Sequence, residues 1–289
     1  MILSRRAYAW GGATLEQQRA LSPSWIVRRC RFDGVFEDER PLRTLGRDIE
    51  PSRARLSVVL AGRVAAFVGG KAWELEEGDA IVASPLGDLF IADVHSSTGF
   101  EVDWDAGSSG AFAVKLRLSS DLFATAREVA EALRLGDVST FARAARGLFQ
   151  RLAVEGFAPP DASALGSVDA PRQIGMSAID AVLNELDVKP QLIDLEARLG
   201  CSRWTLTRSL HQLNQTYGLR GLAGATDWRA MRAFARLRVA GLLMSHPRAT
   251  THGVADYVGF RSPDAMCHAF ANAGLPSPGQ LHAGRLRSL

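Results

Sequence analysis

Residues 195–210 read LEARLGCSRWTLTRSL, and residues 254–270 repeat that pattern as VADYVGFRSPDAMCHAF. Each copy starts with a short segment of helical apolar spacing, turns at a glycine, and continues into a helix that begins at a serine. Apolar residues recur every fourth position on that second helix, so one face is expected to be buried and the other exposed. This order is typical of a helix-turn-helix, whose second helix enters the major groove of DNA. Two copies on one chain would reach neighbouring grooves without a second chain.

The first copy carries the side chains that we expect to meet DNA. Ser202 is expected to cap the helix, while Leu206 and Leu210 pack against the preceding helix. The opposite side presents three polar side chains, Arg203, Thr207 and Arg208, and Trp204 stands early in the same helix as a further candidate contact. An arginine can donate two hydrogen bonds to guanine O6 and N7, which is worth about 1–3 kcal/mol of discrimination. Two interpretations of Trp204 stay open, namely contact with a thymine methyl group or sugar, and ordinary packing in the core.

The composition is that of a soluble protein with two domains. A chain of 289 residues exceeds the usual size of one domain, and its hydrophobic (47%) and charged (22%) fractions are ordinary. No apolar run approaches the roughly 20 residues that span a bilayer, and none near the start fits a signal peptide. The three cysteines, Cys30, Cys201 and Cys267, fit no zinc spacing or disulfide framework. We therefore expect a cytoplasmic protein with no membrane contact, metal ion or cofactor.

Positive charge is concentrated towards the end of the chain. Residues 169–289 hold 14 arginines and lysines against 9 acids, whereas residues 1–168 hold 20 against 22. Between Arg198 and Arg238 there are eight arginines and a single acid, Asp227. Such a segment is attracted to a phosphate backbone. On charge alone, a basic surface that only contacts water is an equally good interpretation. The charge supports nucleic-acid binding because it falls in the same part of the chain as the repeated motif.

Short apolar or β-branched segments, separated by turn residues, fill the first part of the chain. They predict strands at residues 25–32, 55–60, 64–67, 80–83, 89–93, 100–104 and 111–118. Frequent short strands favour a sandwich or barrel. Helical composition follows from Ser119 to Glu155, and its second stretch carries an apolar stripe at Phe141, Ala145, Leu148 and Leu152. The stripe fits either a dimer seam or packing on the chain's own barrel.

The helical half begins after a segment that would break any helix. Residues 156–171 contain paired prolines and small polar residues typical of an interdomain linker. Beyond it, the spacing predicts helices over residues 172–187, 191–199, 202–214, 227–245, 252–258, 263–272 and 278–284. Asp227 is expected to cap the long central helix. One apolar face of that helix comprises Trp228, Met231, Ala235, Val239 and Leu242.

Residues 172–284 resemble the DNA-binding part of the AraC/XylS family of bacterial transcription regulators, in which one long helix joins two helix-turn-helix units. The matching residues are Gly200, Ser202, Leu206, Arg208 and Leu210 in the first unit, Arg236, Leu237, Ala240, Leu242 and Leu243 in the linking helix, and Ala255, Gly259, Phe260, Met266, Phe270, Gly274, Ser277 and Pro278 in the second. The resemblance implies double-stranded DNA and RNA polymerase as partners, and it leaves a homodimer open. In the second unit it places the DNA contacts at Pro263, Asp264, Cys267 and His268.

The chain departs from the family pattern in both units. His268 stands where the family commonly has arginine, and Pro263 and Asp264 offer no long hydrogen-bond donor. We therefore expect the second unit to specify sequence less than the first and mainly to engage the DNA backbone. In the first unit, Glu196 replaces a small residue between the helices, which would loosen their packing. Residues 218–227 form a longer connection than the family has.

Residues 75–85, LEEGDAIVASP, resemble a cupin turn, in which Gly-Asp leads into a strand that ends at proline. Many regulators of this family place a cupin-like sensing domain first, and such a barrel can enclose a small-molecule effector. A pocket could draw on several residues, none of which is assigned a ligand: Arg53, Arg55, Arg63, Trp73, Phe90, His95 and Trp104. His95 is the only histidine before the linker, too few for the usual cupin metal site, and no catalytic motif accompanies it. The chain is therefore not expected to be an enzyme.

Together these patterns predict an α+β protein, with a cupin-like β-barrel or sandwich and flanking helices followed by an all-helical double helix-turn-helix. The predicted domains are a sensing domain at residues 1–155, a linker at 156–171 and a DNA-binding domain at 172–289. The predicted function is that of a sequence-specific, effector-responsive transcription regulator. The alternative is a small-molecule-binding or catalytic cupin whose helical half is a protein-interaction module.

Overall fold

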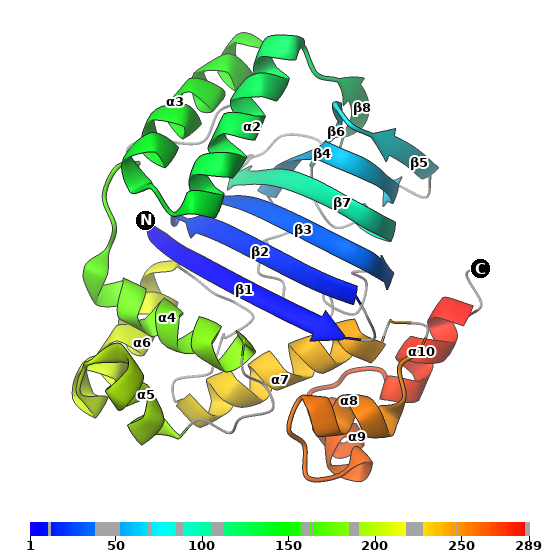
Figure 1. The fold of residues 1–289 in the computed structure, drawn as a ribbon, viewed down its shortest axis with the longest axis vertical. Coiled ribbons are helices and arrows are strands. Elements are labelled where there is room, and N and C mark those ends of the chain that lie inside the picture. Colours follow the sequence, from blue (N-terminus) through cyan, green and yellow to red (C-terminus); the bar gives the residue numbers. More distant parts are fainter. Residues whose placement is uncertain are drawn as a thin grey trace.

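In the computed structural model, an antiparallel sheet from the first part of the chain is followed by helices (Figure 1). The structure describes all residues except 11–12, 38–52, 69–70, 85–88, 106–111, 158–161, 163–164, 185–190, 218–227, 245, 247 and 287–289. The strands are β1 (Ile2–Trp10), β2 (Ala13–Leu21), β3 (Trp25–Glu37), β4 (Arg53–Val68), β5 (Lys71–Glu76), β6 (Asp79–Ser84), β7 (Leu89–Asp105) and β8 (Phe112–Arg117). The helices are α2 (Ser120–Leu135), α3 (Val138–Val154), α4 (Ala170–Asn184), α5 (Leu192–Leu199), α6 (Arg203–Tyr217), α7 (Trp228–Met244), α8 (Thr251–Tyr257), α9 (Pro263–Asn272) and α10 (Pro278–Leu286).

Antiparallel pairing joins the strands in the order β1-β2-β3-β7-β4-β6-β8, and β5 pairs with β4. Among the described residues this path is open between β1 and β8. The predicted β-domain is thus present as one sheet, whereas its closure into a cupin-like barrel stays a prediction.

The predicted strand boundaries were wrong in several places. The segments at residues 55–60 and 64–67 form one strand, β4, and those at 89–93 and 100–104 form β7. Gly62 lies in a bulge of β4 rather than in a turn, with φ at 81°, and a Cβ there would lie 2.7 Å from the Ser96 carbonyl oxygen. The strands β1, β2 and β5 were not predicted, because polar residues interrupt their apolar pattern, as at residues 16–19 of β2.

The helices α2 and α3 cover one face of the sheet (Figure 1). Side chains alternate along β3, so Trp25 and Val27 join the cluster under these helices while Ile26 belongs to the other face. The Trp25 ring is fully buried, and its centroid lies 6.0 Å from that of Phe149. The apolar stripe of α3, residues 141–152, is buried in the same cluster of this single chain. The stripe therefore packs on its own sheet and helix α2 and is not available as a dimer seam.

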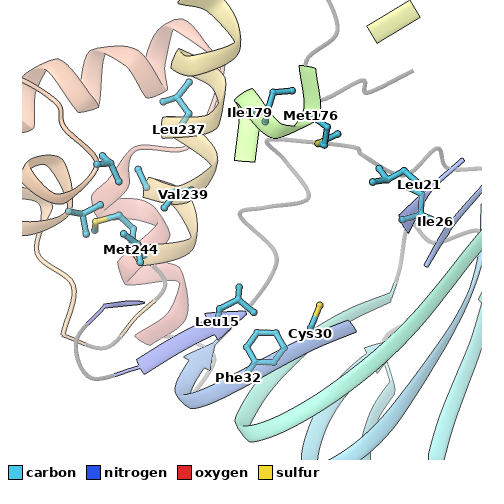
Figure 2. Close-up of a cluster of buried hydrophobic side chains, with 14 of the residues drawn as sticks. Leu15, Leu21, Ile26, Cys30, Phe32, Met176, Ile179, Leu237, Val239 and Met244 are labelled. Carbon is cyan, nitrogen blue, oxygen red and sulfur yellow. The ribbon is translucent and has the colours of Figure 1, made fainter. Parts of the chain in front are cut away.

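The opposite face of the sheet belongs to a second apolar cluster that continues into the C-terminal helices (Figure 2). Leu15, Cys30 and Phe32 from the sheet share this cluster with Met176 of α4 and Leu237 of α7. Strand β3 contributes side chains to both clusters, so both of its faces are buried.

Helix α4 runs along the edge strand β1 (Figure 1) and begins inside the predicted linker. Leu165 of that segment is buried under α2 and α3, and the Asp169 N–H donates to the Met1 carbonyl oxygen at 2.8 Å. The later helices lie within a few residues of their predicted positions, with α6 reaching Tyr217. Asp227 lies outside the described residues, as do the side chains of Met231, Ala235 and Leu242 from the predicted apolar face of α7, whereas Val239 is buried and Trp228 is half-buried. No helix in the described part of the chain is long and apolar enough to cross a membrane.

Candidate nucleic-acid interface

The first repeat folds as a short helix, α5, and a longer one, α6, joined by a tight turn. Gly200 ends α5 in the left-handed conformation, with φ at 61°, and its N–H donates to the Glu196 carbonyl oxygen. The Ser202 hydroxyl accepts a hydrogen bond from the Thr205 N–H at 3.2 Å, which caps the start of α6. The predicted helix, glycine turn and serine cap of the first unit are thus all present.

Helix α6 has one buried face and one exposed face. Leu206, Leu210 and Leu213 are buried in the cluster shared with α4 and α7. The predicted DNA-facing residues are all exposed: Ser202, Arg203, Trp204, Thr207 and Arg208. The Trp204 side chain is 86% exposed, so its interpretation as a core aromatic is wrong.

Glu196 ties the two helices of the first unit together. Its side-chain carboxylate accepts a hydrogen bond from the backbone N–H of Arg203, at the first turn of α6. A negative charge at this place also interacts favourably with the helix dipole. The predicted loosening by Glu196 is therefore wrong, because the longer side chain reaches an N–H group that would otherwise lack a partner.

The second repeat folds as α8 and α9 around Gly259, whose φ is 75°. The Ser262 hydroxyl accepts from the Ala265 N–H at 3.1 Å, and Pro263 occupies the first turn of α9. Met266 and Phe270 are fully buried. Of the predicted contacts in this unit, Asp264 and His268 are exposed, whereas Pro263 and Cys267 are half-buried.

The two exposed ridges differ in charge. Residues 203–217 of α6 contain two arginines and no acid, whereas residues 263–272 of α9 contain Asp264 and no arginine or lysine. Long hydrogen-bond donors are thus confined to the first of the two helices. Figure 1 shows the units on either side of the long helix α7, which contacts both α8 and α9.

Three contacts of the first unit were not predicted from sequence. The Gly175 N–H of α4 donates to the Ser209 hydroxyl of α6 at 2.9 Å, and that hydroxyl donates to the Pro171 carbonyl oxygen. At the end of α6, the Tyr217 hydroxyl donates a hydrogen bond to the Asp169 carboxylate. Burial and this nearby negative charge raise the pKa of Tyr217 to about 12. A glycine inside a helical segment was the one signal for such close packing.

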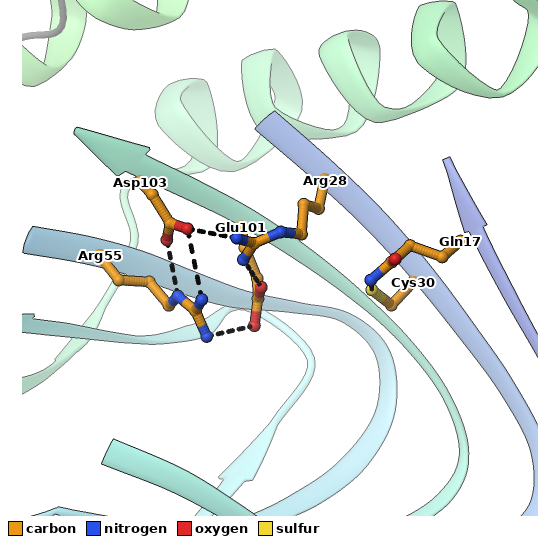
Figure 3. A network of polar contacts seen from close by, with 6 residues as sticks. All are labelled: Gln17, Arg28, Cys30, Arg55, Glu101 and Asp103. Atoms are coloured by element: carbon orange, nitrogen blue, oxygen red, sulfur yellow. Dashed lines mark hydrogen bonds and ion pairs between the residues drawn. The ribbon is translucent and has the colours of Figure 1, made fainter. Parts of the chain in front are cut away.

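In the sheet, strand register gathers two arginines and two acids on the face away from α2 (Figure 3). Arg28 lies opposite Glu101 and Arg55 lies opposite Asp103, with shortest N–O distances of 2.8 and 2.6 Å. The diagonal pairs, Arg28–Asp103 and Arg55–Glu101, lie at 2.5 and 3.3 Å. Burial opposes the charge of Arg28, yet Asp103 and Glu101 hold its pKa above the ordinary value. All four charges are buried and paired within the chain, which favours a structural role for this quartet.

The other residues considered for a ligand pocket are scattered. Trp104 packs in the cluster under α2 and α3, and Arg63 is exposed at a cavity of about 500 Å³ that Asp79 and Lys115 also line. Trp73 is half-buried, and the side chains of Arg53, Phe90 and His95 lie outside the described residues. A second cavity, of about 410 Å³, lies between β1, β2, the end of α2 and α4. Within the described ranges, no three His, Cys, Asp or Glu side chains converge as metal ligands do.

The Gly-Asp turn of the cupin resemblance is formed. Gly78 has φ at 86°, the Asp79 carboxylate accepts from the Glu76 N–H at 3.1 Å, and β6 follows with all its residues buried. Pro85 lies outside the described residues.

No protein-family model matches this chain, and no curated protein matches it in sequence. Similar solved structures include ToxT from Vibrio cholerae, at 12% identity and TM-score 0.35 over 89% of this chain and 98% of that one. The AraC-like transcriptional activator CuxR is 14% identical at TM-score 0.36, over 80% of this chain and 91% of its own. KdgF from Halomonas sp. is 16% identical at TM-score 0.25, over 32% of this chain and 81% of its own. Because these TM-scores are low, support for a function has to come from the residues of this chain.

Proposed function

We propose that this protein is a sequence-specific transcription regulator that reads double-stranded DNA with α6 and α9. The observation that carries the proposal is the surface of α6, where Trp204 is 86% exposed between Arg203 and Arg208 while the other face of the helix is buried. A tryptophan left in water forgoes a large burial energy, which favours a surface kept for a partner. Two exposed arginines on the same helix favour a partner with phosphates and paired acceptors, and DNA offers both.

The roles follow from position on the helix. Arg203, in the first turn, is proposed to contact phosphate, and Arg208, about one and a half turns further, to donate to guanine O6 and N7. Trp204 would press on a thymine methyl group or a sugar. Thr207 would donate a hydrogen bond to a base or a phosphate. The Ser202 side chain would keep capping α6, while the Ser202 backbone approaches the DNA.

The second unit is proposed to bind mainly the DNA backbone. His268 is the one basic side chain among the predicted contacts of α9, and Asp264 suits only an acceptor role, towards the amino group of cytosine. Pro263 and Cys267 would add contact area. Helix α7 would hold the two recognition helices about one turn of DNA apart, roughly 34 Å.

A selection of bound duplexes from a random pool, followed by gel-shift titration at rising salt, tests the proposal. Affinity for the selected duplex should fall steeply with salt, because phosphate contacts release counterions. Arg208→Ala should weaken binding to that duplex by about 1–3 kcal/mol and relax the selected sequence. Arg146→Ala is the matched control, since Arg146 is also an exposed helical arginine but lies on α3.

Two results would count against the proposal. Equal weakening on all sequences would make Arg208 a phosphate contact and refute its proposed reading of bases. Weak, salt-independent binding to every duplex would favour the helical half as a protein-interaction module instead.

The sheet half is proposed to sense a small-molecule effector. What supports this is the presence of two cavities, of about 500 and 410 Å³, within the size range of small-molecule sites. A screen of metabolites for a rise in melting temperature, followed by DNA titration with each hit, tests it. Contact with RNA polymerase, a homodimer and a cytoplasmic location remain predictions of the family resemblance and the composition.

A further inference from the structure

Helix α4 replaces a neighbouring strand along the edge of the sheet. The Gln173 side-chain amide accepts from the Leu3 N–H at 2.7 Å and donates to the Leu3 carbonyl oxygen at 2.8 Å. These are the two bonds that another strand residue would make, so the helix covers an edge that would otherwise be open for pairing.

Asp180 makes a second attachment two helical turns further along the same side of α4. Its carboxylate accepts from the Ser4 hydroxyl at 2.9 Å, the Arg5 N–H at 2.9 Å and the Arg6 guanidinium at 3.2 Å. Asp180 is 7% exposed and Arg6 is 6% exposed, so this ion pair is held away from water. Gln173 and Asp180 together form what we call the β1 clamp.

The same helix also holds the first recognition helix. The Gly175 N–H donates to the Ser209 hydroxyl, and the two backbones lie so close that a Cβ on Gly175 would be 3.1 Å from the Leu210 nitrogen. Ser209 lies on the buried face of α6, directly beside the exposed Arg208. A displacement of α4 therefore has to move α6 or break its packing, because the interface has no space to absorb the motion.

We infer that Gln173 and Asp180 are positioning residues for DNA recognition, in that the β1 clamp fixes α4 on the sheet and α4 fixes the orientation of α6. The inference rests on the proposed function for its consequence on DNA, but the mechanical link itself does not depend on it. Through α4, the N-terminal sheet is connected to the first recognition helix, α6. Helix α9, in contrast, packs on α7 and α8.

Hydrogen exchange followed by mass spectrometry on the full chain tests the link. Asp180→Asn turns one carboxylate oxygen into an NH₂ group that faces hydrogen-bond donors, so exchange should become at least about tenfold faster in α4 and α6 and stay unchanged in α9. Glu131→Gln is the matched control, because it makes the same chemical change in an exposed ion pair with Arg134 on α2. This control should leave exchange unchanged in all three helices.

Gel-shift titration of the same proteins on the selected duplex gives the second readout. Asp180→Asn should weaken binding by about three- to tenfold, because a loosened α6 has to be ordered on DNA. If that variant fails to fold, Gln173→Ala, which changes no charge, takes its place. It should also speed exchange in α4 and α6 and weaken DNA binding, with smaller effects.

Faster exchange confined to α4, with α6 unaffected, would overturn the inference. Tighter DNA binding by Asp180→Asn would also overturn it, because the clamp would then be inhibitory. If the unaltered protein binds no duplex while both helices lose protection in the variant, the proposed function fails and the mechanical link stands.

Discussion

Replacing Gly175 by alanine tests the contact on which the placement of α6 depends. Gly175 is buried in the middle of α4, and an added Cβ would lie 3.1 Å from the Ser209 carbonyl carbon, the Leu210 nitrogen and the Ser209 hydroxyl. Two of these three atoms are backbone of α6, so they cannot move without shifting the helix. Ordinary van der Waals contact requires several tenths of an ångström more.

The expected magnitude is the difference between two opposing effects. Alanine favours a helix over glycine by about 1 kcal/mol. Forcing an extra methyl group into a packed interface costs about 1–3 kcal/mol. Gly147 provides the reference, because it lies inside α3 and an added Cβ there meets no atom within 4 Å. Gly147→Ala should therefore stabilise by about 0.5–1 kcal/mol, and Gly175→Ala should be less stable than Gly147→Ala by roughly 2 kcal/mol.

Urea unfolding followed by circular dichroism measures both variants against the unaltered protein. Comparing two Gly→Ala changes in helices cancels most of the effect on the unfolded chain. If Gly175→Ala were as stable as Gly147→Ala, the close approach of α4 and α6 would be refuted, and with it the mechanical link from the sheet to α6.

Two further expectations concern α9 and the end of α6. Phe270→Ala should lower the free energy of unfolding by about 3–5 kcal/mol, because the buried ring leaves a cavity, whereas Trp204→Ala should change it by no more than about 0.5 kcal/mol while weakening DNA binding. Similar losses of stability in the two variants would contradict the assignment of one ring to the core and the other to the surface. The pKa of Tyr217 rises from 10.0 to about 12 on folding, so the unfolded chain releases this proton first and stability should fall as pH rises from 10.0 towards 12. In Tyr217→Phe, stability should fall less between about pH 9 and about pH 11 than it does in the unaltered protein. If the two proteins lost the same stability between these pH values in thermal melts, Tyr217 would not be the group involved.

Helices α6 and α9 could both be predicted because their signals are local. Ser262 caps α9 through an N–H three residues away, and Gly259 supplies a left-handed turn that a side chain would strain. Fourth-residue apolar spacing then fixed which face is buried, and Met266 and Phe270 are buried accordingly. Each of these signals spans a few residues, so the rest of the chain has little influence on it.

The sheet could be predicted only in part. Polar runs hid β1 and β2, whose arginines and glutamines find buried partners that the sequence does not reveal, as Gln18 finds Arg29. The ion quartet depends on register, since Arg28 meets Glu101 only if β3 and β7 align as they do. A shift of one residue would have sent these charges to the opposite face.

For the candidate interface, the amino-acid sequence by itself determined the two helix pairs, the exposed ridge of Arg203, Thr207 and Arg208, and the contrast in charge between α6 and α9. Tertiary structure alone decided that Trp204 is a surface residue, that Glu196 caps α6, and that Asp180 joins α4 to β1. The physical reason is distance along the chain. Helix caps and apolar periodicity act within one or two turns, whereas Asp180 and Arg5 are 175 positions apart and meet only after the sheet and the helices have packed together.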